Sequence, residues 1–218
     1  MNKLRIWNID WEVDTAGPSP NMNNRVELFL KGCNKASNNP CKGCFNDMIW
    51  DKSAETLHDP KTVAVQINKC APNKYISISG GEPLDQIDGL IELCSELKKF
   101  DFHILVYTHY ELKTLLKNNL DNKVLKLLDN VDILVDGPYV EKLNIYDLYK
   151  DDGLHNSVGS SNQIVWDVKY YNDNDNSQLT GIKAEYLNML SLTIENDLVY
   201  GVKNLKIPDE TILIERAA

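Results

Sequence analysis

Long apolar runs are missing from this chain of 218 residues. No stretch approaches the ~20 consecutive apolar residues that a membrane-spanning helix needs. Residues 1–7 turn polar too soon for a secretory signal peptide. The composition is not that of a collagen, a coiled coil or a disordered chain, and there is no internal repeat. We therefore expect a cytoplasmic protein with no membrane partner.

Positive charge is scarce as well. The chain has 23 Lys and Arg residues against 32 Asp and Glu residues, which gives a net charge of −9. A surface that binds nucleic acid needs a basic patch to neutralise the phosphates, so we expect no nucleic acid partner. The acidic residues are spread along the chain, which is typical of a solvated surface.

Cysteine is infrequent too, and its count of five is odd. A cytoplasmic chain seldom uses cysteine for disulfides. Cys33, Cys41 and Cys44 cluster within twelve residues, whereas Cys70 and Cys94 stand apart. Both isolated cysteines fall at helical spacing with apolar residues, so we predict that they are buried as small hydrophobic side chains.

Hydrophobic residues, by contrast, make up 43% of the chain, which is enough to build a core. Apolar runs that predict strands alternate with apolar residues at helical spacing over residues 1–138. This alternation is typical of an α/β fold with a parallel sheet and right-handed crossovers. The expected strands are 4–7, 25–31, 75–79, 102–107 and 131–135, and the expected helices are 60–70, 84–100 and 110–129.

The pattern loosens after residue 138. We expect a further strand at 163–168, an exposed polar loop at 172–177, and a hairpin at 192–202. The chain therefore divides into a core domain at 1–166 and a small β-rich C-terminal extension at 167–218.

Two motifs follow directly after expected strands. The clustered cysteines lie in the loop 32–52, and the run Gly80–Pro83 follows the strand 75–79. Chains with α/β folds place their binding sites at such strand ends. Adjacent glycines let a ligand lie against bare backbone. The same run could also be an ordinary strand-to-helix turn, with Pro83 in the first helical turn.

The cysteine spacing, C-x7-C-x2-C, leaves three interpretations open. The thiols could be plain loop residues, although exposed free cysteines are a liability. The three cysteines and His58 could hold a structural zinc ion. Alternatively, three thiolates could hold a [4Fe–4S] cluster in which one iron lacks a protein ligand and stays open to a substrate or cofactor. The Gly80–Pro83 run favours the cluster.

Six runs of the sequence resemble radical S-adenosylmethionine enzymes, specifically the small glycyl-radical-enzyme activases of the anaerobic ribonucleotide reductase-activating type. The matches are collinear over about residues 4–166. They are Arg25–Cys33, Cys41–Asn46, Ser79–Leu84, Tyr107–Tyr110, Val135–Tyr139 and Gly159–Gln163. Three features depart from the family pattern: four extra residues between the first two cysteines, Val158 in place of an arginine, and the tail after about residue 167.

The resemblance implies a partial (β/α)6-type radical S-adenosylmethionine barrel with a mostly parallel open sheet. It implies an oxidoreductase in which Cys33, Cys41 and Cys44 ligate a [4Fe–4S] cluster whose open iron binds S-adenosylmethionine. Reductive cleavage would give a 5′-deoxyadenosyl radical, and an activase would use it to generate a glycyl radical on a partner enzyme. The electron would come from a donor such as flavodoxin or ferredoxin.

The resemblance also implies where the cofactor lies. The glycine run would lie against the methionine part, the two residues after Cys44 near the adenine or ribose, and three later strand-end residues around the same cavity. These cofactor-binding candidates are Phe45, Asn46, Gly80, Gly81, Glu82, Pro83, Tyr107, Thr108 and Asp136. Two alternatives remain: a radical enzyme that modifies another peptide or a small molecule, and a zinc-stabilised binding module without catalysis.

Overall fold

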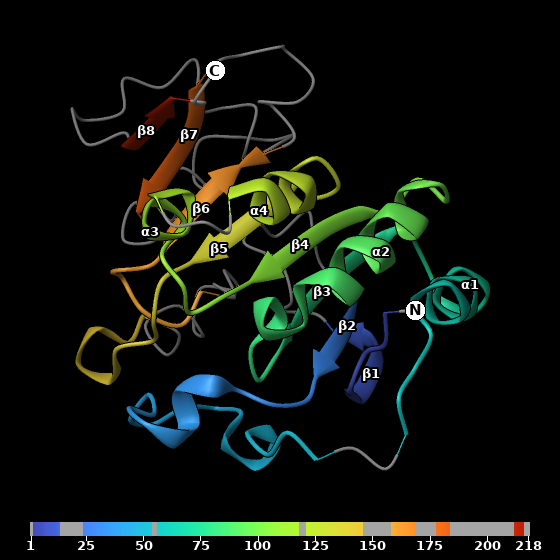
Figure 1. Ribbon diagram of the computed structural model, residues 1–218, viewed down its shortest axis with the longest axis horizontal. Coiled ribbons are helices and arrows are strands. Elements are labelled where there is room, and N and C mark those ends of the chain that lie inside the picture. The colour runs from blue at the N-terminus through green and yellow to red at the C-terminus, as the bar shows by residue number, and fades with distance from the viewer. Residues whose placement is uncertain are drawn as a thin grey trace.

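The computed structural model describes residues 2–13, 24–53, 56–117, 121–145, 158–168, 178–183 and 212–215. They form one sheet with helices packed on it (Figure 1). The strands are β1 (Ile6–Val13), β2 (Arg25–Leu30), β3 (Tyr75–Gly80), β4 (His103–Tyr107), β5 (Ile133–Asp136), β6 (Ile164–Asp167), β7 (Gln178–Lys183) and β8 (Ile212–Glu215). The α-helices are α1 (Pro60–Cys70), α2 (Ile87–Lys98), α3 (Leu112–Lys117) and α4 (Asp121–Leu128), and the short 3-10 helices are η2 (Asn34–Ser37), η3 (Asp47–Ile49), η4 (Pro83–Gln86) and η5 (Glu141–Leu143).

The strands follow one another across the sheet in sequence order, from β1 at one edge to β8 at the other, so the sheet is open. Strands β2 to β5 are parallel to one another, whereas β1 pairs antiparallel with β2, and strands β6 to β8 continue antiparallel from β5. The predicted α/β class is therefore confirmed, and its parallel part is the four central strands. The C-terminal strands β7 and β8 have the expected β character, and they extend this same sheet.

Alternation along the strands gives the sheet two different faces. Val26, Leu28 and Leu30 of β2 point into the main core, and the intervening Glu27 and Phe29 take the other side. On the core side, strands β3 to β5 supply Ile76, Ile78, Ile104, Val106 and Leu134. Helices α1, α2 and α4 cover this apolar face in that order, as Figure 1 shows. These three helices therefore do not cover the opposite face of the sheet.

Helix α1 begins where the sequence predicts it. The Asp59 side chain accepts a hydrogen bond from the Thr62 N–H at 3.0 Å, and Pro60 takes the first helical position. Cys70, however, is exposed, so the prediction of burial is wrong. Cys70 is the last residue of the helix, and Ala71 packs against the core in its place.

The predicted helix at 84–100 consists of the 3-10 helix η4 followed by α2. The Glu82 side chain accepts a hydrogen bond from the Leu84 N–H at 2.8 Å and so caps η4. Within α2, Cys94 is fully buried, as predicted. The region predicted to be helical at 110–129 contains two separate helices, α3 and α4.

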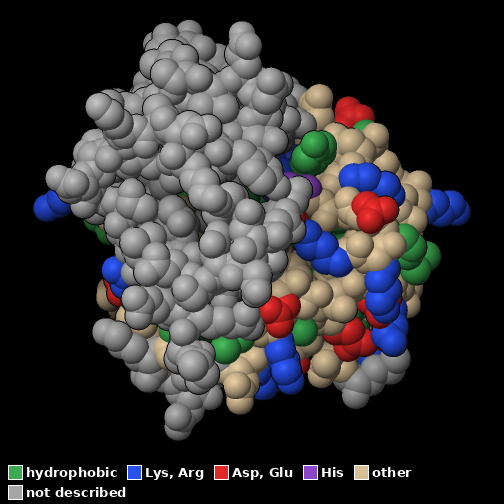
Figure 2. Space-filling model, turned by 90° about the horizontal axis from the view of Figure 1, so that it is seen from above, with side chains coloured by type: hydrophobic (Ala, Val, Ile, Leu, Met, Phe, Trp, Pro, Cys, Tyr) green, Lys and Arg blue, Asp and Glu red, His purple; other side chains and the backbone are tan. Residues whose placement is uncertain are grey.

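The predicted strand at 163–168 is confirmed as β6. The predicted loop at 172–177 and hairpin at 192–202 lie outside the described residues. In the part of the chain that the structure describes, no helix combines the length and hydrophobicity needed to cross a bilayer. On the face shown in Figure 2, Lys and Arg side chains are interspersed with Asp and Glu over the described surface.

Candidate active site

A cavity of about 380 Å³ lies at the carboxyl ends of the parallel strands. Residues that follow β2, β3, β4 and β5 line it, and it continues along the sheet face opposite the helices. On that face the lining side chains are Glu27 and Phe29 of β2, Ser79 of β3 and Tyr107 of β4. The volume falls in the range of small-molecule sites, about 300–1,000 Å³.

Eleven of the twelve residues proposed from the sequence line this one cavity, although they come from four separate segments of the chain. They are Cys33, Cys41, Cys44, Phe45, Asn46, Gly80, Gly81, Glu82, Pro83, Tyr107 and Thr108. The exception is Asp136.

The three clustered cysteines are free thiols. The Asn46 N–H donates to Cys44 Sγ at 3.4 Å. Burial raises the pKa of the Cys33 thiol, and hydrogen bonds from the backbone N–H groups of Lys35 and Ala36 oppose that rise. N–H groups directed at sulfur are the contacts by which proteins tune iron–sulfur clusters. The donor set therefore fits a cluster held by these thiolates.

The cysteines do not form a site for a single metal ion. Within the described ranges, no three His, Cys, Asp or Glu side chains gather closely enough to hold one. Zinc would draw its thiolates to within about 2.3 Å of one point, whereas a four-iron cluster is wider and spreads its ligands apart. His58, the candidate fourth zinc ligand, pairs with Leu4 through its backbone and is not among the cavity-lining residues. His58 therefore does not share the cavity with the three cysteines.

Gly80 and Gly81 pack against the end of β2. The Gly81 N–H donates to Leu30 O, and the Glu82 N–H donates to Gly32 O, each at 2.8 Å. A Cβ at Gly80 would stand 2.2 Å from Leu30 O, and a Cβ at Gly81 would stand 2.2 Å from Gly32 O. Gly80 also has a φ of 119°, which favours glycine. Close backbone approach therefore requires both glycines, a reason that the sequence did not suggest.

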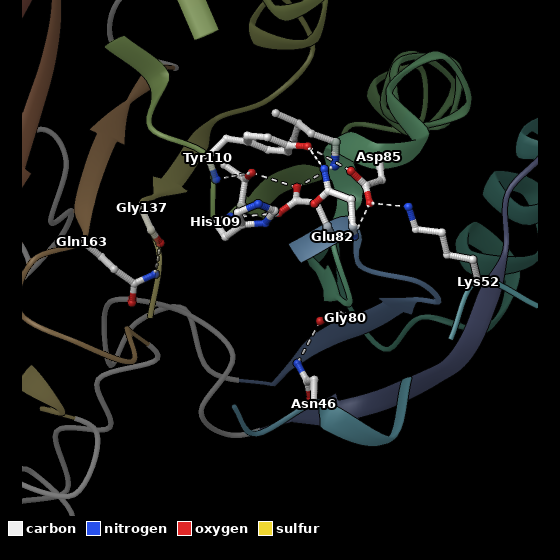
Figure 3. Close-up of polar contacts among 12 residues, drawn as sticks. Asn46, Lys52, Gly80, Glu82, Asp85, His109, Tyr110, Gly137 and Gln163 are labelled. Carbon is white, nitrogen blue, oxygen red and sulfur yellow. Dashed lines mark hydrogen bonds and ion pairs between the residues drawn. The ribbon is translucent and has the colours of Figure 1, made fainter. Parts of the chain in front are cut away.

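The Glu82 carboxylate is enclosed by protein donors (Figure 3). Its Oε1 accepts from the Leu84 N–H and from Thr108 Oγ1, both at 2.8 Å. Its Oε2 accepts from the His109 N–H at 2.9 Å and lies against His109 Nδ1. The His109 ring lines the cavity and stacks on Tyr110, with 4.2 Å between the ring centroids. Glu82 thus joins the ends of β3 and β4, with both carboxylate oxygens occupied.

Phe45 and Asn46 come directly after the last clustered cysteine. Asn46 Nδ2 donates to Gly80 O at 3.1 Å, which connects the cysteine loop to the glycine run (Figure 3). The Phe45 side chain is 56% exposed, and its ring centroid lies 5.4 Å from that of Tyr139. Phe45 therefore offers an accessible aromatic ring beside the cavity.

A second network holds the loop after Cys33. Asp85 accepts from the Asn34 N–H at 2.7 Å and from Tyr110 Oη at 3.0 Å, and Lys52 Nζ lies 3.6 Å from its Oδ2 (Figure 3). Asn34 Nδ2 also donates to Tyr110 Oη. Burial and the neighbouring carboxylate raise the pKa of Tyr110 to about 12. The network fixes both ends of the cysteine loop to η4.

Asp136 does not line the cavity. Its carboxylate is buried and accepts from the Leu112 N–H at 2.6 Å, at the start of α3. Burial raises its pKa to about 6, and the Leu112 N–H and the Trp166 side chain act in the opposite direction. The next residue, Gly137, lines the cavity instead. Asp136 ends β5 on the helix side of the sheet, a choice of face that its position in the sequence did not reveal.

Sequence reasoning missed several lining residues. Ser79 Oγ donates to Glu27 Oε1 at 3.2 Å across β2 and β3. Burial raises the pKa of Glu27 to about 7 despite this hydrogen bond. The sequence did contain an indication of Glu27, because it is a single acidic residue inside an apolar strand. Burying an acidic side chain costs free energy unless it is hydrogen-bonded or paired. The other lining residues that were missed are Phe29, Lys35, Ala36, Pro40, Trp50, Gly137, Tyr139, Gly159 and Gln163.

Gln163 binds backbone groups on the β5 side of the cavity. Its Oε1 accepts from the N–H groups of Gly159 and Ser160 at 3.0 and 3.1 Å. Its Nε2 donates to Gly137 O at 3.0 Å, as Figure 3 shows. Val158, which stands where the resemblance has an arginine, is fully buried. This run therefore shapes the cavity through its backbone.

Comparisons with known proteins agree with this geometry. A family model described as a 4Fe-4S single cluster domain matches residues 22–166. The chain is 30% identical over 126 residues, or 54% of its length, to an anaerobic ribonucleoside-triphosphate reductase-activating protein of Haemophilus influenzae, and covers 76% of that relative. Proteins of the same name from Vibrio cholerae and Enterobacteria phage T4 are 28% and 27% identical over 65% and 76% of this chain, which covers 86% and 94% of them.

Proposed function

Since this chain belongs to the 4Fe-4S single cluster domain family and to the anaerobic ribonucleoside-triphosphate reductase-activating proteins, we propose that it generates a glycyl radical on an anaerobic ribonucleotide reductase. One observation carries the proposal. The three cysteines and the Gly80–Pro83 run line the same cavity, and backbone hydrogen bonds join the segments that bear them.

The cofactors of this reaction are a [4Fe–4S] cluster and S-adenosylmethionine. Cys33, Cys41 and Cys44 would hold three irons of the cluster and leave the fourth open. When bound, the two cofactors supply one electron and a 5′-deoxyadenosyl group that takes a hydrogen atom from the target glycine, leaving methionine, 5′-deoxyadenosine and a glycyl radical. A flavodoxin or ferredoxin would provide the electron.

The chain itself positions these groups and excludes water. The backbone of Gly80, Gly81 and Pro83 would lie against the methionine part of S-adenosylmethionine. The hydrogen bonds that enclose Glu82 hold this stretch of backbone in place. Among the remaining lining residues, the Phe45 ring and the Asn46 amide would contact the adenine or the ribose, and Tyr107 and Thr108 would border the same space. Asp136 instead accepts a hydrogen bond from the Leu112 N–H on the other face of the sheet, at the start of α3.

The open sheet suits a protein substrate. We assign it to the partial (β/α)6-type barrel of radical S-adenosylmethionine enzymes, with a core domain at 1–166 and a C-terminal extension at 167–218. A partial barrel leaves one side through which the glycine-bearing loop of a large partner could enter. The parallel strands β2 to β5 and the cavity opposite the helices support this assignment.

Anaerobic reconstitution tests the proposal. The reduced protein, with S-adenosylmethionine and the anaerobic ribonucleoside-triphosphate reductase of the same organism, is expected to give a glycyl EPR doublet on the reductase. It should release 5′-deoxyadenosine and methionine in equal amounts, and Cys41→Ser should give neither product. Cleavage without any radical on the reductase would favour modification of another peptide or a small molecule. One zinc per chain, without iron or sulfide, would support a binding module instead.

A further inference from the structure

Two carboxylates line the cavity, Glu27 and Glu82, and they differ in how many hydrogen bonds they accept. Glu82 receives three hydrogen bonds and also lies against His109 Nδ1. Glu27 receives one hydrogen bond within the described ranges, from Ser79 Oγ at 3.2 Å. A carboxylate has about four acceptor positions. Glu27 therefore brings unused acceptor capacity to the cavity, whereas Glu82 brings almost none.

Glu27 also lies apart from the groups assigned to the cofactors. It precedes Leu30, the last residue of β2, by three positions, and so stands about 10 Å back along the strand at ~3.3 Å per residue. The cysteines lie beyond the end of β2, and the glycine run begins at Gly80, the last residue of β3. On this face Glu27 lies beside Phe29 and Ser79. Its register partners are Asp10 of β1 and Ser77 of β3, and the buried Arg25 precedes it by two positions on the same strand. Glu27 thus belongs to the part of the cavity that lies along the sheet.

The target of the proposed reaction restricts what this carboxylate could bind. A glycine has no side chain, so a protein can recognise the segment around it only through backbone N–H and C=O groups and neighbouring residues. A backbone N–H in a water-excluding cavity needs an acceptor. A carboxyl group keeps free acceptor lone pairs in both of its protonation states, so it can accept a hydrogen bond from that N–H. Among the described residues, Glu27 supplies the carboxyl group with spare acceptor capacity on the sheet face of this cavity, where Ser79 and Tyr107 supply hydroxyl groups.

We propose that Glu27 is a positioning residue for the protein substrate: its carboxyl group accepts a hydrogen bond from a backbone N–H of the segment that carries the target glycine. The assignment rests on the proposed function, because it requires a polypeptide in the cavity. Glu27 does not exchange an electron or a hydrogen atom. It holds the glycine Cα at the correct place relative to the cofactor, where a small displacement is costly to the rate.

Two substitutions at Glu27 test this role with the reconstituted enzyme and the reductase of the same organism. Glu27→Met keeps the length of the side chain and removes the acceptor, whereas Glu27→Gln keeps one acceptor oxygen. Glu27→Met should raise the KM for the reductase roughly ten- to hundredfold and yield fewer glycyl radicals per 5′-deoxyadenosine. Glu27→Gln should stay within about threefold of wild type. Glu12→Met is the matched control, because Glu12 is exposed on β1.

The possible failures are distinguishable. If Glu27→Met matches Glu12→Met in KM and in glycyl radicals per 5′-deoxyadenosine, the role of Glu27 is disproved. If wild type cleaves S-adenosylmethionine and leaves no radical on the reductase, the proposed function fails first. If the Glu27→Met protein binds iron poorly, its activity cannot be compared with that of wild type. In that case the affinity of the cluster-free variants for the reductase is measured by calorimetric titration. Weaker binding than the control supports the proposal, and equal binding overturns it.

Discussion

Glu27 is the residue whose charge state matters most to this cavity. Its pKa is raised from 4.5 to about 7, chiefly by burial and in part by Asp10 on β1, while Ser79 on β3 and Arg25 on β2 act in the opposite direction. The folded protein therefore holds a proton on Glu27 at pH values where the unfolded chain has released it. Stability from this group is complete below about pH 4.5 and is lost as the pH rises through about 7.

The substitution Glu27→Gln removes this dependence. It mimics the protonated carboxyl, so the variant should exceed wild type in free energy of unfolding by about 1–3 kcal/mol at pH 8 and by much less at pH 5. Urea unfolding monitored by circular dichroism at the two pH values measures the difference. Glu12→Gln should show no such change, and an equal gain at both pH values would contradict the assignment of the titration to Glu27.

Gly81 packs closely against the backbone that leads from β2 to Cys33. Gly81→Ala would place a Cβ 2.2 Å from Gly32 O, a backbone atom that cannot move without shifting Cys33. We expect the free energy of unfolding, measured by urea denaturation, to fall by about 3 kcal/mol or more. The variant should also bind less iron on reconstitution than wild type. Gly159→Ala, whose Cβ would stand 3.0 Å from the Tyr139 ring, should cost less, since a side chain can shift.

At this scale the sequence identified residue types better than their partners. It placed Gly80, Gly81 and Glu82 at the site, but it did not show that close packing against the chain after β2 also requires both glycines. The distances from the two glycines to Leu30 and Gly32 depend on how β2 pairs with β3. The sequence of either strand alone does not give this pairing. Asp136 illustrates the same limit, because the side of a buried strand that its last residue takes depends on the helix packed beside it.

Among the elements, the cysteine loop between β2 and α1 is held in place mainly by Asp85 of η4. Asp85→Ala removes the acceptor for the Asn34 N–H and for Tyr110 Oη. We expect the free energy of unfolding to fall by about 1–3 kcal/mol. We also expect faster hydrogen exchange of the amides of residues 31–53, measured by mass spectrometry. Asp88→Ala is the control, since Asp88 is half-exposed and pairs only with Lys123 in the described part of the chain. Equal protection of the loop in both variants would contradict the role given to Asp85.

Strands and helices were predictable where periodicity was strong. The runs that became β2, β3, β4 and β5 read as buried strands because both faces of a central parallel strand are covered. Boundaries were less accessible: the turn at η4 depends on the Glu82 side chain, and the burial of Ala71 in place of Cys70 depends on where α1 ends. These are tertiary effects that a local pattern does not contain.

For the molecule as a whole, the cluster should contribute to stability, because its ligands come from a loop that the sheet alone does not order. Removing the cluster with a chelator under anaerobic conditions is expected to lower the Tm by about 5 °C or more and to expose residues 31–53 to proteases. Differential scanning calorimetry and limited proteolysis measure both effects. Cys41→Ser should already resemble the chelated protein, and an unchanged Tm in wild type would contradict this contribution.

The parallel centre of the fold followed from the strand–helix repeat, whereas its antiparallel edges did not. The chain between β1 and β2 and the chain after β5 lie outside the strand–helix repeat of the sequence, so nothing in that repeat indicated the direction of β1 or of β6 to β8. The convergence of four segments on one cavity was predictable only through the shared rule that parallel strands end at the same edge.

The order of strands across the sheet is also their order along the chain. Each new strand can therefore pair with one that has already been synthesised, and no strand has to be inserted between two others. Growth of this kind keeps loop closure short at every addition, and chains emerge from the ribosome with their N-terminal parts first. The protein is thus suited to folding during translation, with the cysteine strand β2 already paired on one side before the glycine run arrives on β3.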